Sequence, residues 1–253
     1  MYFRLGTKII VAINMSSPKK FKSCCYCGKN GIRDKVTITY DHIPPQSFLT
    51  PEEKQKYNLI TVPACMECHQ DLSTIDETVK FMHTICIARL EKQADHFKFM
   101  ESARRTIKEN KTYTTVLKEA KTILALDTNM ILMPHVKIKF PLNFWDDFNK
   151  FFTRLSQALY YRETKLRLKA NIFNVFILAG FDFNRPIDIF EEYKKIEFLE
   201  KDLIPIMQKR NYINGAFSYL YAKTIDRQDS CSFIYILRES LVVSVFCNVE
   251  YPY

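Results

Sequence analysis

Two short runs in the first third of the chain alternate β-branched or aromatic residues with polar ones. Residues 36–40 (Val-Thr-Ile-Thr-Tyr) have the alternation of a strand, and residues 59–62 (Leu-Ile-Thr-Val) predict a second strand that ends at Pro63. Between the two runs, Pro44-Pro45 interrupts regular structure, and residues 46–57 are polar, as expected for a loop. The pattern therefore predicts strand, loop and strand in this order.

Helical patterns follow the second predicted strand. A helix is expected to begin near Cys65, and Ser73 followed by Asp76 is typical of a capping box at the start of a new or resumed helix. Residues 86–124 continue as a charged, amphipathic region of one long helix or two. The basic side chains of this region favour a solvated helix face over a phosphate contact.

The second half of the chain has a different pattern. Aromatic and aliphatic residues recur at helical spacing over residues 142–163, which predicts a helix that faces a core. Apolar runs predict four further strands, at residues 172–178, 217–221, 232–237 and 241–245.

Together these elements predict an α+β protein of more than one unit. We expect a lead-in at residues 1–18, a compact module at 19–92, a helical connector at 93–129 and a C-terminal α+β domain of unknown type at 130–253. The pattern leaves open whether Met1 or Met15 is the true start.

The charge of the chain favours a polyanionic partner. Lys and Arg number 37 against 28 Asp and Glu, a net charge of +9. Residues 1–60 alone carry ten Lys and Arg against four Asp and Glu, so the surplus is concentrated around the predicted N-terminal module. No stretch approaches the ~18 apolar residues of a membrane span, so we expect no membrane partner.

Four of the eight cysteines fall into two Cys-x-x-Cys pairs. Cys24 with Cys27 and Cys65 with Cys68 have the spacing of tetrahedral zinc ligands, with Cys25 as an extra candidate. Paired cysteines in a chain without a secretory signal indicate metal ligands in a reducing compartment, so we expect a cytoplasmic protein. Four sulfur ligands close a zinc site, and such a zinc ion is expected to be structural.

The residues around the two cysteine pairs resemble those of a known family. They are Asp41-His42-Ile43-Pro44-Pro45, Asn58-Leu59 and Cys65-Met66-Glu67-Cys68-His69. Over roughly residues 24–80 this pattern is similar to the HNH endonuclease family, whose module has the ββα-metal fold. Residues 41–49 (Asp-His-Ile-Pro-Pro-Gln-Ser-Phe-Leu) also resemble the HNH segment of the CRISPR effector nuclease.

The resemblance implies a role for each matching residue. His42 would be the general base, and Asn58 would fix the loop that carries it. Asp41 and His69 would bind one catalytic Mg²⁺ or Mn²⁺ ion, and cleavage would leave a 5′-phosphate and a 3′-hydroxyl. Because successive strand residues face opposite sides, Asp41 and His42 reach one site only if the strand ends there, and we expect that end.

The chain also departs from common versions of the family. Many members have a glycine-containing loop after the Asp-His-x-x-Pro segment and a lysine shortly after the last ligand, whereas residues 51–54 here are Pro-Glu-Glu-Lys and residues 70–72 are Gln-Asp-Leu. Other basic residues are therefore candidates for phosphate contacts, although each is also explained as an ordinary surface charge: Lys29, Arg33, Lys35 and Lys80.

The sequence leaves three functions open. The first is a DNA endonuclease acting on double-stranded DNA, with a role in bacterial phage defence or restriction. The second is a non-catalytic zinc module that binds nucleic acid or a protein. The third is an RNase or toxin nuclease, because the metal chemistry does not distinguish DNA from RNA. Residues 130–253 would recognise a target, form a homo-oligomer or dock onto a partner protein.

Overall fold

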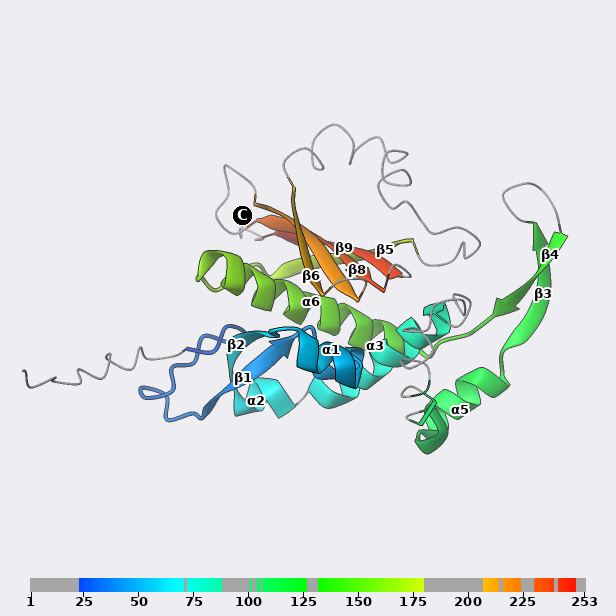
Figure 1. Cartoon of the computed structure of the whole chain (residues 1–253), viewed down its shortest axis with the longest axis horizontal. Coiled ribbons are helices and arrows are strands. Elements are labelled where there is room, and N and C mark those ends of the chain that lie inside the picture. Colours follow the sequence, from blue (N-terminus) through cyan, green and yellow to red (C-terminus); the bar gives the residue numbers. More distant parts are fainter. Residues whose placement is uncertain are drawn as a thin grey trace, which may run out of the picture.

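The protein is a mixed α+β structure with three antiparallel sheets among the described residues (Figure 1). The computed structural model describes residues 23–70, 72–87, 101, 104–105, 107–126, 132–179, 207–213, 216–223, 230–238 and 241–248. The predicted lead-in at residues 1–18 lies outside these ranges, as does most of the stretch on either side of the predicted boundary at residue 92.

The N-terminal unit follows the predicted order of strand, loop, strand and helix. Its elements are β1 (Ile38–Ile43), the 3-10 turn η1 (Gln46–Phe48), α1 (Pro51–Lys56), β2 (Ile60–Cys65), α2 (Met66–Gln70) and α3 (Leu72–Ile87). The predicted loop thus contains η1 and α1. Helix α1 begins with a capping box, in which the Thr50 hydroxyl accepts from the Glu53 backbone while the Glu53 carboxylate accepts from the Thr50 backbone.

Both strands of this unit are longer than predicted. The sequence predicts that the first strand ends at Asp41-His42, but β1 continues to Ile43, with Asp41 opposite Val62 and His42 opposite Thr61. Ile43 pairs with Ile60 and both are buried, so burial of this cross-strand pair extends the ladder. Strand β2 continues through Pro63. An edge strand tolerates proline, and among the described residues one edge of β2 has no strand partner.

Part of the predicted helical region is a hairpin instead. Residues 88–100 lie outside the described ranges, and helix α5 (Lys111–Lys118) begins after Asn110, whose side chain accepts from the backbone of Thr112 and Tyr113. Strand β3 (Lys121–Leu126) then pairs with β4 (Leu132–Lys137). This hairpin stands away from the other described elements (Figure 1). The run Thr-Ile-Leu-Ala-Leu is rich in residues that suit a strand, so the predicted helical region ends before it.

The C-terminal half contains the predicted helix and a five-stranded sheet. Helix α6 spans Leu142–Thr164, as the periodicity predicts. The strands are β5 (Ile172–Ala179), β6 (Gln208–Ile213), β7 (Phe217–Lys223), β8 (Cys231–Leu237) and β9 (Leu241–Asn248), in the order β5-β9-β8-β7-β6. Four of them coincide with predicted strands. Strand β6 has no counterpart among the predicted strands because its sequence, Gln-Lys-Arg-Asn-Tyr-Ile, has no apolar run.

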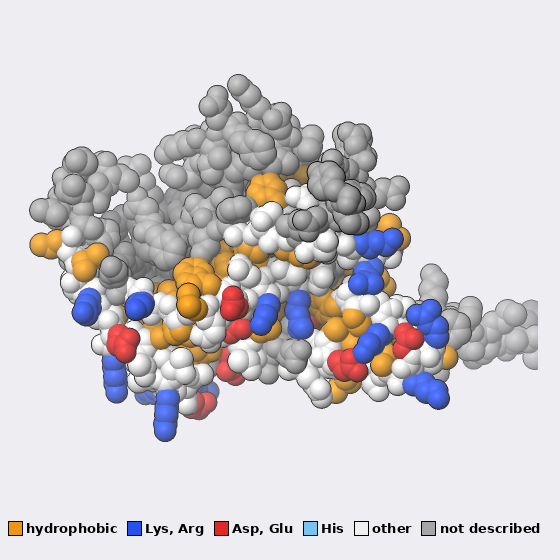
Figure 2. All heavy atoms as spheres, turned by 180° about the vertical axis from the view of Figure 1, so that it is seen from behind, with side chains coloured by type: hydrophobic (Ala, Val, Ile, Leu, Met, Phe, Trp, Pro, Cys, Tyr) orange, Lys and Arg blue, Asp and Glu red, His pale blue; other side chains and the backbone are white. Residues whose placement is uncertain are grey.

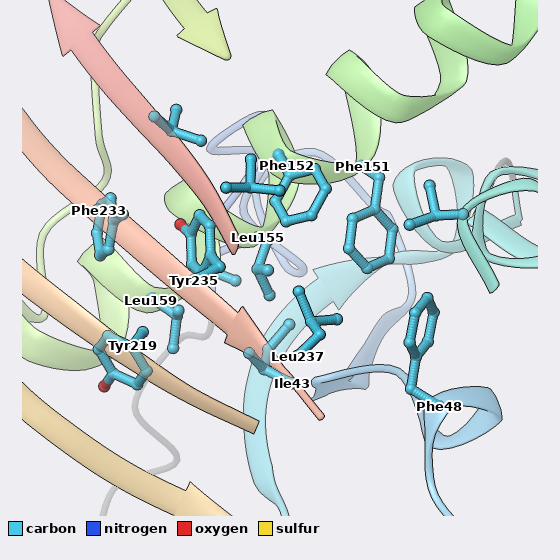
Figure 3. Packing of buried hydrophobic residues seen from close by; sticks show 14 of the residues in the cluster. Ile43, Phe48, Phe151, Phe152, Leu155, Leu159, Tyr219, Phe233, Tyr235 and Leu237 are labelled. Atoms are coloured by element: carbon cyan, nitrogen blue, oxygen red, sulfur yellow. The ribbon is translucent and has the colours of Figure 1, made fainter. Parts of the chain in front are cut away.

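Helix α6 lies between the sheet and the N-terminal unit (Figure 1). Its buried aromatic residues contact both sides: Phe152 packs against Tyr235 of the sheet with the two rings tilted by 39°, and Phe151 contacts Phe48 of η1. In Figure 3, Ile43 of β1 and Leu237 of β8 point into the same apolar cluster. The N-terminal unit and the sheet therefore share one core, built on α6.

A candidate metal centre and an adjacent acidic cleft

The predicted cluster of four thiols is present. The Sγ atoms of Cys24, Cys27, Cys65 and Cys68 all lie within 4.8 Å of one another, and those of Cys27 and Cys65 are 3.7 Å apart. A tetrahedral site with Zn–S bonds of about 2.3 Å requires sulfur atoms about 3.8 Å apart. The donor set and its spacing therefore fit a tetrahedral metal ion such as zinc. Buried Cys25 is not part of the cluster.

Local backbone geometry brings the four thiols together. Cys24 and Cys27 lie in a tight turn closed by the bond from the Gly28 N–H to the Cys24 carbonyl, at 2.9 Å. Gly28 has φ +80, and a Cβ atom there would lie 2.8 Å from Nη1 of Arg167, so the turn requires glycine. Cys65 is the last residue of β2, and Cys68 lies in α2.

The backbone around the cluster favours a thiolate at one position. Burial acts to raise the pKa of the Cys24 thiol, but hydrogen bonds from the backbone of Cys27, Cys65 and Tyr26 outweigh it and lower the pKa to about 7. Burial raises the pKa of the neighbouring Cys25 thiol. Because the thiolate is the form that binds metal, Cys24 is prepared as a ligand. Burial also raises the pKa of Cys27 and Cys68, so Cys25 is excluded by its position outside the cluster and not by its pKa.

Beside the thiol cluster, the structure brings Asp41 and His69 together. Oδ1 of Asp41 and Nδ1 of His69 are 3.8 Å apart, and Nδ1 of His69 is a buried atom with no hydrogen-bond partner among the described residues. Two ligands of one divalent cation, each about 2.1 Å from it, lie at most about 4.2 Å apart. The pair therefore fits two ligands of one ion, and the unpartnered nitrogen has a lone pair or a proton still to satisfy.

Tyr26 fixes the second oxygen of Asp41. The Tyr26 hydroxyl donates to Oδ2 of Asp41 at 2.5 Å. Burial, together with the nearby Asp41 charge, raises the pKa of Tyr26 well above its ordinary value, so the phenol stays a donor. A carboxylate held in this way presents its other oxygen, Oδ1, toward His69.

Asp41 lines a small cleft that also contains Asp76 of α3 and Arg154 of α6. The other lining residues are aromatic or apolar: Tyr26, Ile43, Pro45, Phe151 and Leu155. Burial raises the pKa of Asp76 to about 8, with the Asp41 charge adding to the effect and Arg154 opposing it. Helix α3 begins at Leu72, one residue before the predicted cap Ser73, and Asp76 of this helix lines the cleft.

His42 occupies the opposite face of β1. Its neighbours on that face by register are Thr61 and, two residues away, Tyr40. The Gln46 side-chain amide donates to Nε2 of His42 at 3.0 Å, which places the ring proton on Nδ1. Asn58 is exposed in the segment between α1 and β2. The expected convergence of His42 with Asp41 on one side of a broken strand is therefore absent from the described geometry.

The four candidate phosphate contacts have different surroundings. Lys29 pairs with Glu67, Arg33 pairs with Asp34 at 3.2 Å, and Lys35 is exposed. Lys80 is buried inside α3, and this burial lowers the pKa of its ammonium group. On the face shown in Figure 2, basic side chains of the described residues are spread out with acidic ones among them. An exposed cation suits phosphate binding, so this arrangement does not favour Lys80.

No family model matches the chain, and neither the curated proteins nor the solved structures contain a match to it. Among the described residues, no helix is both long and apolar enough to cross a membrane. The site is therefore interpreted from its own geometry.

Proposed function

We propose that this protein is a divalent-metal-dependent endonuclease of the HNH type that hydrolyses phosphodiester bonds in DNA. The observation that carries the proposal is the approach of Asp41 to the unpartnered nitrogen of His69, next to a thiol cluster suited to zinc. A structural zinc ion alone requires neither of these two side chains, because four sulfur ligands complete its coordination.

In this proposal, the zinc ion is structural, and it affects catalysis only by fixing the position of His69. Cys68 binds zinc and its neighbour in sequence, His69, binds the catalytic cation, so the thiol cluster fixes one of the two catalytic ligands. Asp41 supplies Oδ1, while Tyr26 holds Oδ2. A Mg²⁺ or Mn²⁺ ion bound there would supply Lewis-acid stabilisation of the charge that builds on the phosphate oxygens.

The base in this proposal is His42. Its Nε2 lone pair accepts a proton from water as the water oxygen bonds to phosphorus and the bond to the 3′ oxygen breaks. The departing 3′ oxygen takes a proton from a solvent water molecule, so the products are a 5′-phosphate and a 3′-hydroxyl. The Gln46 amide holds this lone pair in the free protein, so the attacking water takes the place of Gln46 when substrate binds.

His42 and Asp41 face opposite sides of β1, but a substrate that lies along the edge of this strand can contact both. Strand β1 pairs with β2 alone among the described residues, so its other edge has no strand partner. A phosphodiester that lies along this edge meets Asp41 from one face of the strand and His42 from the other. The substrate, rather than a break in the strand, would then bring the two side chains into one reaction.

A non-catalytic zinc module is the second candidate. The observation in its favour is the regular pairing of Asp41 and His42 in β1, which points the two side chains to opposite faces. In this case the thiol cluster would stabilise a binding surface, and Asp41 and His69 would have no role in chemistry.

Cleavage and metal binding together separate the two candidates. The full-length, zinc-loaded protein is incubated with supercoiled plasmid or single-stranded RNA, with Mg²⁺, Mn²⁺ or no added cation. We expect cation-dependent plasmid cleavage that Asp41→Asn and His69→Ala each reduce by at least ~100-fold, while Thr37→Ala, on the segment before β1, matches the parent. Absence of cleavage by the parent with either cation would favour the binding module, and cleavage of RNA alone would favour an RNase.

A further inference from the structure

Helix α6 contributes one charged side chain to the cleft beside the thiol cluster. Arg154 lines this cleft with Asp41 and Asp76, although it lies 86 residues from Cys68 in the sequence. Two contacts of its guanidinium group with the N-terminal unit lie close to the proposed cation ligands. Nη1 donates to the Cys68 carbonyl at 2.8 Å, and the guanidinium carbon lies 5.8 Å from the centre of the Tyr26 ring.

Each contact is made with a group that holds one of the two proposed cation ligands, His69 or Asp41. The Cys68 carbonyl belongs to the peptide group that joins Cys68 to His69, so the bond from Arg154 fixes the backbone that carries the imidazole. Arg154 lies over the ring of Tyr26, and the Tyr26 hydroxyl donates to Oδ2 of Asp41. Such outer contacts orient the direct ligands of metal sites and set their affinity.

We propose that Arg154 is a positioning residue for the Asp41–His69 pair, through which helix α6 of the C-terminal half holds the divalent-cation site of the N-terminal unit. This inference rests on the proposed function. It assigns the C-terminal half a role in building the cation site, beyond target recognition or docking.

The chemistry of the guanidinium group explains why arginine is suited to this place. A planar guanidinium stacks on an aromatic face with its surface and donates hydrogen bonds from its edge at the same time. A lysine ammonium is a point charge that cannot do both in one geometry. If Arg154 acted only by offsetting the charges of Asp41 and Asp76, lysine would replace it.

Calorimetric titration of Mn²⁺ into the zinc-loaded full chain tests the proposal without relying on activity. We expect Arg154→Lys and Arg154→Gln to raise the Kd for Mn²⁺ by about 10- to 100-fold. The matched control is Arg162→Lys, at an exposed position of the same helix, and its Kd should equal that of the parent. Zinc content and thermal unfolding are measured for each variant to confirm folding.

Tyr26→Phe tests the same positioning role if the Arg154 variants do not fold. It keeps the ring beneath the guanidinium group and removes the hydroxyl that holds Asp41, so it should also weaken Mn²⁺ binding by about 10-fold or more. If Arg154→Lys folds and binds Mn²⁺ as tightly as the parent, the positioning role is overturned. If the Arg154 variants do not fold, a Tyr26→Phe variant that binds Mn²⁺ as tightly as the parent overturns it instead. A parent that does not bind Mn²⁺ overturns the proposed function itself, and the inference with it.

Discussion

The ion pair between Glu53 and Arg238 links the segment after His42 to the C-terminal sheet, and its loss should destabilise the whole chain. Both Glu53 oxygens accept from Arg238, at 3.1 and 2.7 Å, and Arg238 also donates to the Phe48 carbonyl at 2.9 Å. The Arg238 side chain is 2% exposed and that of Glu53 is 15% exposed. Glu53→Gln would leave a buried guanidinium group without its counter-charge.

The size of the effect follows from this burial. Removing one partner of a buried ion pair costs about 3–5 kcal/mol, because the other charge stays desolvated. The glutamine oxygen and the Phe48 carbonyl still accept from Arg238, so we expect a loss of about 2–4 kcal/mol in the free energy of unfolding. For a chain of this size, such a loss corresponds to a Tm lower by roughly 5–15 °C.

Urea unfolding followed by circular dichroism measures this loss. Arg33→Gln removes the exposed pair with Asp34 and should change the free energy of unfolding by no more than about 0.5 kcal/mol. Adding Arg238→Met to Glu53→Gln removes the unpaired charge and should recover part of the stability. Glu53→Gln with the stability of the parent would refute the reasoning that a desolvated pair joins the two units.

Three further changes test other parts of the structure. Cys65→Ser removes one of four thiolates, so it should lower zinc content, measured colorimetrically, and reproduce the melting curve of the metal-stripped parent. Asp76 holds its proton more tightly in the folded protein, where its pKa is about 8, than in the unfolded chain. The free energy of unfolding therefore falls as the pH rises from about 4 to about 8. Without added divalent cation, Asp76→Asn should therefore gain stability over the parent across that window, and an equal gain at pH 4 and pH 8 would contradict this. Gly28→Ala, at φ +80 and against Arg167, should lose about 1–3 kcal/mol in urea unfolding, whereas an unchanged midpoint would show that the turn adapts.

The parts of the site that were predictable lie close together in sequence or follow fixed spacing. The two Cys-x-x-Cys pairs predict four converging thiols because each pair forms one tight turn around an ion. His69 could be placed next to this cluster because it follows Cys68 directly. The order of strand, loop, strand and helix was likewise readable from alternation and from the proline pair.

The parts that were not predictable depend on contacts between distant segments. Arg154 lies on a helix whose apolar periodicity predicts core packing, and nothing local indicates that this one side chain reaches Cys68. Asp76 belongs to a predicted capping box, and only tertiary packing shows that it also lines a cleft. The length of β1 was decided by burial of Ile43 against Ile60, a cross-strand contact that the local pattern of residues 36–40 does not contain.

Plasmid cleavage by His42→Ala tests the central claim most directly. The variant removes the proposed base from the face of β1 opposite Asp41, so zinc content, melting behaviour and Mn²⁺ affinity should match those of the parent. We predict that its Mn²⁺-dependent cleavage rate falls by about 10²–10⁴-fold. A folded His42→Ala protein that cleaves as fast as the parent would contradict the account.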